Sequence, residues 1–162
     1  ATGIELALFL AEYGAMPPDV FKFLMFYQEH HGLKLDDAMK MLFRGKKKVT
    51  VLEMLPKAGN SLGKSTKWAL LEKCEKLGVK IITSAKVTEI GEDYVNYIDG
   101  QDNEQMTNDV DAVYYATGVK PNNKLYKEIK KLKIPVYRVG DARKPQTVVE
   151  ATQRAYKYAN KL

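Results

Sequence analysis

The chain has 162 residues, 45% of them hydrophobic and 28% charged, a composition typical of one ordinary globular domain with a real core. It holds no apolar run of membrane-spanning length and no secretory signal, so we expect a soluble, cytoplasmic protein without a membrane partner. The single cysteine, Cys74, excludes an internal disulfide, a redox dithiol and a metal cluster built from this chain's thiols alone. Its spacing from neighbouring leucines predicts a buried, apolar thiol in a helix.

The formal net charge is +6, from 26 basic and 20 acidic residues. Basic proteins often bind nucleic acid, but the run Lys46-Lys47-Lys48 has no aromatic residues between its lysines. A solvated turn that also favours anionic ligands explains it at least as well. We therefore expect no nucleic-acid partner.

Residues 1–13 predict a largely apolar helix that packs against a sheet, with Gly3 at its amino end. A helix that opens on glycine follows the last glycine of the dinucleotide-binding pattern G-x-G-x-x-G. The first two glycines and the strand before them would precede Ala1. We therefore expect a parallel sheet that lacks its first strand in this sequence.

Residues 14–45 read as an insertion of two short helices, one from Pro17-Pro18 to Gly32 and one from Asp36 or Asp37 to Gly45. Such an αα-hairpin, rich in Phe and Met, either packs on its own domain or docks on a partner, and the first interpretation is favoured. The only histidines, His30 and His31, are adjacent and so face different sides of a helix, and we expect no metal site.

The run KKVTVLEM predicts a short buried strand over residues 49–52 with Glu53 at its carboxyl end, where open parallel sheets place their ligands. A carboxylate there can accept both hydroxyls of an adenosine ribose. Gly3 and Glu53 are 50 positions apart, against roughly 20 in a minimal dinucleotide-binding unit. The insertion accounts for the excess.

Residues 65–77 predict a helix with Trp68, Leu71, Cys74 and Leu77 on its inner face, and residues 79–83 predict a strand parallel to the first. Three brief strand patterns between residues 87 and 107 predict an antiparallel meander. Residues 111–115 predict a buried strand that ends in Ala116-Thr117-Gly118, small residues that let a backbone lie against a planar ligand.

Residues 123–133 are polar and lysine-rich and predict a surface helix or linker. Residues 134–139 predict a last strand, ending in Gly140-Asp141, where a carboxylate can take hydroxyls or order phosphates. Residues 147–162 predict an amphipathic helix.

The chain resembles the NAD(H)-binding and FAD-binding region of pyridine nucleotide-disulfide oxidoreductase-like flavoproteins in five stretches that follow in the same order: TGIELALFLAE, KKVTVLEM, LGVKIITSAKVTEI, DAVYYATGVKPNN and VYRVGDA. More narrowly, the chain resembles the carboxyl-terminal part of NADH:flavin oxidoreductases related to 2,4-dienoyl-CoA reductase and 2-enoate reductase. The resemblance implies an α/β fold: a Rossmann-like parallel sheet with an antiparallel β-meander and the inserted αα-hairpin. It also implies an NAD(H)-binding domain at 1–130, with the insertion at 14–45, and a segment of a split FAD-binding domain at 131–162.

The resemblance assigns cofactor-binding residues and no catalytic side chain or metal ligand. Gly3 and Glu53 would hold the adenosine half of NAD(H), and Thr117 and Gly118 would lie beside the bound dinucleotide. The FAD-binding residues would be Gly140, Asp141, Thr147 and Val148. Glu53, with no arginine directly after it, favours NADH because a carboxylate repels a 2′-phosphate at close range.

The activity so implied is hydride transfer from NADH to FAD, for reduction of an enoyl-type substrate elsewhere in a parent enzyme. FMN and a 4Fe-4S cluster are expected only in a barrel domain outside this sequence, and we expect the present stretch to be inactive by itself. Its partners would be the rest of the FAD domain and the barrel, and an exposed sheet edge also allows homo-oligomers or strand swapping. The alternative is a non-catalytic interaction fragment whose hairpin docks on neighbouring domains.

Overall fold

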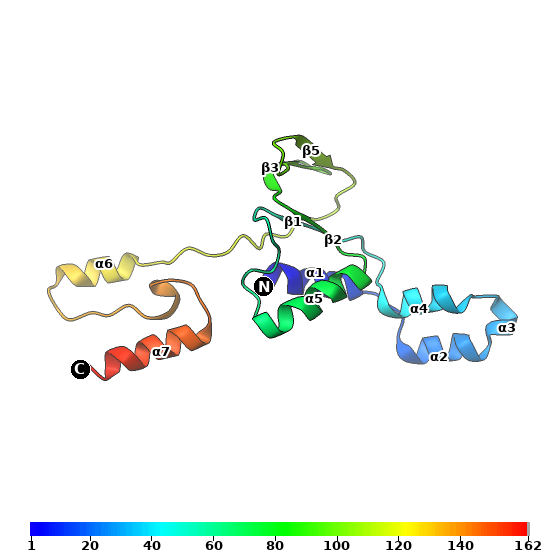
Figure 1. Ribbon diagram of the computed structural model, residues 1–162. Helices are drawn as coiled ribbons and strands as arrows, with labels where there is room; N and C mark the ends of the chain where they lie inside the picture. Colours follow the sequence, from blue (N-terminus) through cyan, green and yellow to red (C-terminus); the bar gives the residue numbers. More distant parts are fainter. Residues whose placement is uncertain (162) are drawn as a thin grey trace. The chain divides into compact units, whose positions relative to one another are not determined.

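The computed structural model describes residues 1–161, and the chain forms two compact units, Ala1–Ala116 (unit 1) and Thr117–Leu162 (unit 2) (Figure 1). The predicted division after residue 130 concerns cofactor domains rather than compact units, and it stays a prediction. Within residues 1–161, no helix is both long and apolar enough to cross a bilayer.

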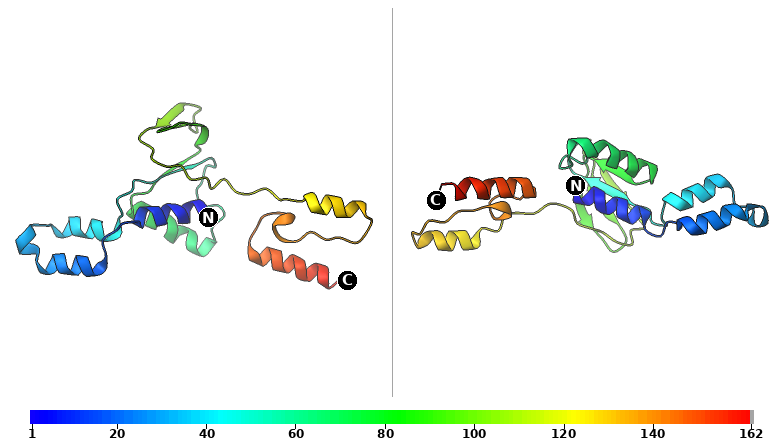
Figure 2. Two further views of the ribbon diagram at one scale, coloured as in Figure 1. Left: turned by 180° about the vertical axis from the view of Figure 1, so that it is seen from behind. Right: turned by 90° about the horizontal axis from the view of Figure 1, so that it is seen from below.

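The core of unit 1 lies between two helices and a two-stranded parallel sheet. Helices α1 (Thr2–Glu12) and α5 (Lys64–Lys76) pack side by side, and strand β1 (Thr50–Glu53) pairs in parallel with β2 (Lys80–Thr83) (Figures 1 and 2). Apolar residues recur along α1 at helical spacing and are buried, as the sequence predicts. The buried cluster comprises Ile4, Ala7, Leu8, Ala11, Ala58, Cys74, Leu77 and Val79.

The inserted hairpin consists of α2 (Pro18–Phe26), α3 (Gln28–His31) and α4 (Leu35–Phe43). Helices α2 and α4 contact each other, and Gly32 ends α3 in the left-handed conformation at φ +65°. At the base of the hairpin, the Gly45 N–H donates to the Ala11 carbonyl (2.6 Å), and the Arg44 guanidinium donates twice to the Lys76 carbonyl (3.0 and 2.8 Å). Arg44 thus places a cation on the last turn of α5, where a helix dipole favours one.

The large apolar side chains of the hairpin are exposed rather than packed on the rest of unit 1, contrary to the favoured expectation. Of the hairpin helices' residues, Ala38 alone is buried, whereas Phe23 is 60% and Phe26 82% exposed. The sequence pattern predicted helices over these stretches, but the structure divides the first of them into α2 and α3 at Tyr27. The pattern could not show that their apolar faces lack a cover within unit 1.

The predicted meander is confirmed. Strands β3 (Lys86–Ile90), β4 (Val95–Ile98) and β5 (Glu104–Thr107) form an antiparallel sheet with β4 in the centre. Val95 and Tyr97 on β4 are buried, with the two-residue period of a strand that has one covered face. The Asp99 carboxylate accepts the N–H groups of Gln101 and Asn103 and closes the turn between β4 and β5.

Unit 2 contains helix α6 (Lys124–Lys131), the short 3-10 turn η1 (Gly140–Ala142) and helix α7 (Val148–Ala159). The turn η1 packs against α7. Thr147 and Glu150 form a capping box at the start of α7, which satisfies backbone N–H groups that the first helical turn leaves free.

Three sequence predictions are wrong in detail. Residues 111–115 and 134–139 form no strand, because in residues 1–161 the hydrogen-bonded sheets contain β1 to β5 only, and an extended segment needs a paired neighbour to become a strand. Trp68 was expected on the inner face of its helix but is 67% exposed. That face of α5 is filled by Leu70, Leu71, Cys74 and Leu77.

Candidate functional site

The site is the edge of unit 1 where β1 ends and α1 begins. At the far end of α1, Gly45 bonds to the Ala11 carbonyl and the Lys47 ammonium lies 4.5 Å from the centre of the Tyr13 ring, just before β1 starts. At the near end, the Ala1 amino group donates to Ser61 Oγ (2.5 Å), in the loop that follows β1. Helix α1 therefore runs antiparallel to β1, and Gly3 lies at the same edge of the sheet as Glu53.

Glu53 closes β1 with a side chain that is only partly exposed and is already oriented. Its Oε1 accepts the N–H of Leu55 (2.9 Å), while its own carbonyl accepts the N–H of Ala85 (2.9 Å), from the end of β2. One carboxylate oxygen is thus held by the backbone. The other, Oε2, makes no hydrogen bond within residues 1–161, so this carboxylate retains acceptor capacity at the strand end.

The amino end of α1 packs tightly against the segment that follows the meander. A Cβ added to Gly3 would lie 3.1 Å from the Cβ of Ala116, closer than nine in ten real contacts of this kind. A side chain at position 3 would therefore push against Ala116. Ala116 is the first residue of the predicted Ala116-Thr117-Gly118 run. This residue lies beside Gly3 at the sheet edge, although residues 111–115 form no strand.

The other predicted cofactor-binding residues belong to unit 2. Gly140 and Asp141 lie in η1, which packs on α7, and a Cβ added to Gly140 would meet the Ala151 Cβ at 3.7 Å. Thr147 precedes the first residue of α7, Val148. Gly140, Asp141, Thr147 and Val148 are thus gathered around η1 and α7.

The amino end of α7 already has an anionic group on it. The Thr147 hydroxyl bonds to Glu150 Oε2, the Thr147 N–H donates to the same oxygen (3.1 Å), and these bonds lower the pKa of the Glu150 carboxyl. Thr117 and Gly118 start unit 2; Gly118 has a φ of +84°, which favours glycine, and open space where a side chain would be.

The structure thus brings Gly3 and Glu53 to one edge in unit 1, and Gly140, Asp141, Thr147 and Val148 together in unit 2. Sequence reasoning missed Ser61 and Ala85, which join the loops after β1 and β2 to this edge. Ser61 lies in a Gly59-Asn60-Ser61 turn, and such a pattern predicts a loop without showing where the loop returns.

The described residues offer no metal centre: within residues 1–161, no group of three or more His, Cys, Asp and Glu side chains could hold an ion. Cys74 is fully buried, and burial raises the pKa of its thiol against the opposing effect of the Lys73 charge. A protonated, inaccessible thiol is a poor nucleophile. It acts as part of the core, as its sequence position predicts.

A parallel β-α-β unit with an acid at the strand end, continued by an antiparallel meander, places the chain in the class of Rossmann-like α/β folds. The chain belongs to the pyridine nucleotide-disulphide oxidoreductase family, whose model matches residues 1–155. The predicted family and fold class are thereby confirmed.

Among curated proteins, the chain is 33% identical over 161 residues to a metal reductase of Desulforamulus reducens, covering 99% of this chain and 23% of that protein. Among solved structures, a 2-naphthoyl-CoA reductase bound to 2-naphthoyl-CoA matches with a TM-score of 0.59 and 24% identity, over 75% of this chain and 18% of that one. Histamine dehydrogenase from Rhizobium sp. 4-9 matches with a TM-score of 0.62 and 19% identity, over 82% and 21%. The chain therefore spans about a quarter or less of these relatives, and the two solved structures bear on its fold alone.

Proposed function

We propose that this chain is the NAD(H)-binding module of a multidomain, FAD-dependent NADH oxidoreductase. The observation that carries the proposal is the placement of the Glu53 carboxylate and the amino end of α1 at one edge of the β1–β2 sheet. Ligands of open α/β sheets bind beyond the carboxyl ends of the strands, and pyrophosphates bind at helix amino ends. Membership of an oxidoreductase family supports the same conclusion.

The residues at this edge fit the adenosine half of a nicotinamide dinucleotide. Glu53 has a free carboxylate oxygen for ribose hydroxyls, and Gly3 lies in the first turn of α1 at the same edge, where the lack of a side chain lets Ala116 approach closely. A carboxylate at this place disfavours the 2′-phosphate of NADPH. Gly140 and Asp141, beside the start of α7, would contact FAD, while the capping of that helix by Glu150 leaves less of its amino end for phosphate.

The chemistry would be hydride transfer from nicotinamide to flavin, which the cofactors themselves supply. The residues of this chain would bind the donor, fix its orientation and exclude water. No acid or base side chain is required of them. For the parent enzyme we propose an enoyl-type final acceptor, a substrate class that the resemblance to 2-enoate and 2,4-dienoyl-CoA reductases suggests.

Calorimetric titration of NADH and NADPH into the chain tests the proposal, with Glu53→Gln as the diagnostic variant. Hydrogen bonds to a charged group are worth about 1.5–3 kcal/mol, so the variant should bind NADH about ten- to a hundredfold more weakly. Glu92→Gln, an exposed acid in the meander, is the matched control and should leave affinity unchanged. Equal affinity for both nucleotides, with no effect of Glu53→Gln, would contradict the assignment.

A second candidate function, docking of the hairpin on neighbouring domains, is favoured by the exposure of its aromatic residues. Phe23, Phe26 and Phe43 are 60%, 82% and 56% exposed, and Met41 is 49% exposed. Exposed apolar side chains that lie together on one element are typical of a surface that contacts another protein or domain, whereas single exposed apolar residues are normal. A folded chain that binds neither nucleotide in the calorimetric experiment would favour this candidate.

A further inference from the structure

The two units carry opposite net charges. Residues 117–161 contain twelve Lys and Arg against three Asp and Glu, a net of +9, whereas residues 1–116 contain fourteen against seventeen, a net of −3. The basic character of the chain thus arises entirely in unit 2. The net charge of +6 for the whole chain therefore hides a much higher charge density over residues 117–161.

The positive charge of unit 2 is not neutralised by ion pairs. Within residues 1–161 the ion pairs are Lys40–Asp37, Lys73–Glu12 and Lys76–Glu72, and all three lie in unit 1. In unit 2, the Glu150 carboxylate is engaged by Thr147 at the start of α7. Uncompensated like charge destabilises a compact unit but steers oppositely charged partners toward it.

Helix α6 concentrates this charge on one side. Lys124, Lys127 and Lys131 are spaced three and four residues apart, which aligns them on one helical face, and Lys130 flanks them. All four are exposed, and we call them the lysine stripe. Like charges at these spacings disfavour the helix, although Glu128, four residues after Lys124 and three before Lys131, offsets part of the repulsion. A lysine in the first turn also opposes the helix dipole. The arrangement therefore has a cost in local stability that an acidic partner would offset.

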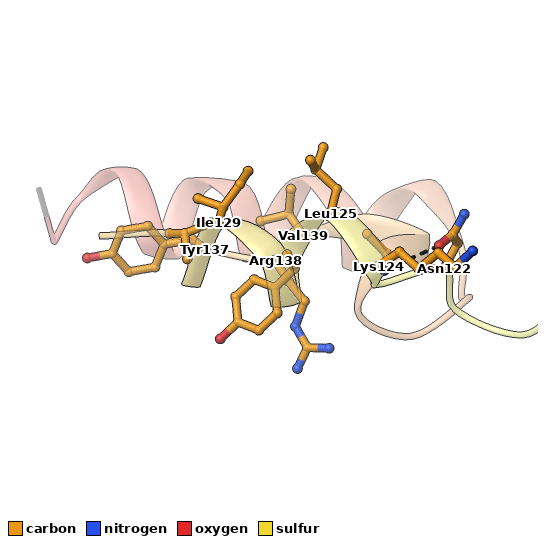
Figure 3. Close-up of a pocket in the computed structure, with 10 residues that line it drawn as sticks. Asn122, Lys124, Leu125, Ile129, Tyr137, Arg138 and Val139 are labelled. Carbon is orange, nitrogen blue, oxygen red and sulfur yellow. Dashed lines mark hydrogen bonds between the residues drawn. The ribbon is translucent and has the colours of Figure 1, made fainter. Parts of the chain in front are cut away.

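The apolar face of α6 is directed into unit 2. Leu125 and Ile129 line a shallow groove of about 500 Å³ together with Val136 and Val139 (Figure 3). Lys127, Lys130 and Lys131 are not among the residues that line it. Most of the stripe is therefore presented to solvent.

We propose that the lysine stripe of α6 is a docking site for an acidic protein surface. All its cations are lysines, which attract carboxylates as point charges and lack the planar guanidinium fork with which arginine pairs bidentately to guanine. The aromatic rings beside it already have partners: the Arg138 guanidinium lies 4.3 Å from the Tyr126 ring centre, and the ring centres of Tyr137 and Tyr158 lie 5.0 Å apart with the rings tilted by 40°. Each ring thus has one side occupied by a neighbour, which leaves less of it for stacking on a nucleic-acid base. Charge complementarity of this kind sets association rate and partner choice.

Fluorescence anisotropy with labelled poly-L-glutamate as the probe tests the proposal on the full chain. Charge reversal by Lys127→Glu, Lys130→Glu and Lys131→Glu together should weaken binding at least about tenfold and flatten its dependence on salt. Reversal of three exposed lysines of unit 1, Lys22, Lys34 and Lys86, makes the same change in net charge and should alter affinity less than about twofold.

A triple lysine-to-arginine variant at 127, 130 and 131 keeps the charge and should bind poly-L-glutamate as the unchanged chain does, which separates loss of charge from loss of folding. Equal weakening by the unit 1 and α6 reversals would overturn the proposal. So would tighter binding of duplex DNA, or of phosphatidylglycerol-containing vesicles, than of poly-L-glutamate through the same lysines.

Discussion

Units 1 and 2 differ in how their parts are held together. Unit 1 buries a continuous apolar cluster between α1, α5 and the β1–β2 sheet, and its meander buries Val95 and Tyr97. None of the described residues of unit 2 is buried; Leu125 is 67% and Val148 78% exposed there. Unit 2 is held together by the capping box of α7, by the contact of η1 with α7 and by the contact between the tilted rings of Tyr137 and Tyr158. The difference indicates that unit 1 supplies its own folding energy, whereas unit 2 depends on contacts outside itself.

The largest expected effect distinguishes the two units directly. Leu8→Ala removes a side chain that is 6% exposed in the unit 1 core, and it should lower the free energy of unfolding of unit 1 by about 2–5 kcal/mol. Leu125→Ala removes the same atoms from an exposed position in unit 2 and should change stability by less than about 0.5 kcal/mol. Denaturant unfolding followed by Trp68 fluorescence and circular dichroism measures both. Equal losses would mean that unit 2 is packed as well as unit 1.

A smaller effect is expected where the hairpin joins the core. A Cβ added to Gly45 would lie 2.1 Å from the Tyr13 carbonyl oxygen, so Gly45→Ala forces backbone atoms apart and should cost about 1–3 kcal/mol. At Gly63, an added Cβ meets only Thr66 Oγ1 at 3.5 Å, an ordinary contact. Gly63→Ala is therefore a control without a steric clash; because Gly63 caps the amino end of α5, where glycine is preferred to alanine, it should cost some stability but less than Gly45→Ala in the same unfolding measurement. A neutral Gly45→Ala would show that the hairpin is not anchored at this point.

The smallest effect is an acid-dependent loosening of unit 2. The Thr147 hydroxyl, bonded to Glu150, holds the pKa of that carboxyl below its usual value. A carboxyl whose folded-state pKa is lowered stabilises the fold above its unfolded-state pKa, and this contribution disappears as pH falls through the folded-state pKa. Amide signals of α7 followed by NMR should therefore weaken in acid.

Glu150→Gln should remove that acid dependence, and Glu128→Gln on α6 should leave it in place. In unit 1, the Asp99 pKa is likewise lowered, by the N–H groups of Gln101 and Asn103. Since β4 is held by buried side chains, the meander should survive acid that loosens α7. Simultaneous loss of both regions would contradict the contrast between the two units.

Local patterns predicted most of unit 1, because there each element's own residues decide its structure. The apolar spacing of α1, the β-branched runs of β1 and β2 and the turns of the meander all specify their elements locally. Residues 111–115 and 134–139 carry the same β-branched pattern, yet a strand also needs a paired neighbour, and none is present in residues 1–161. The prediction that Trp68 lies on the inner face of α5 is wrong for a related reason, because helical spacing alone does not show which side of the helix packs against the core.

For the site, the sequence predicted which residues matter at the sheet edge but not what brings them together. The spacing of Gly3 and Glu53 is distorted by the hairpin, and their common edge follows only from the antiparallel course of α1 and β1. The contacts of Ser61 and Ala116 with the start of α1 depend on loop paths that residue patterns do not encode. The charge contrast between units was present in the sequence, but it became visible only once the unit boundary was known.

The central claim is that Glu53 and the amino end of α1 form one adenosine-binding edge. The most direct test is to follow backbone amide signals of the labelled chain by NMR during titration with NADH. The account predicts that the largest shifts fall at residues 2–4, 53–55 and 116, and that the hairpin signals stay unchanged. Saturable shifts confined to other parts of the chain would contradict it.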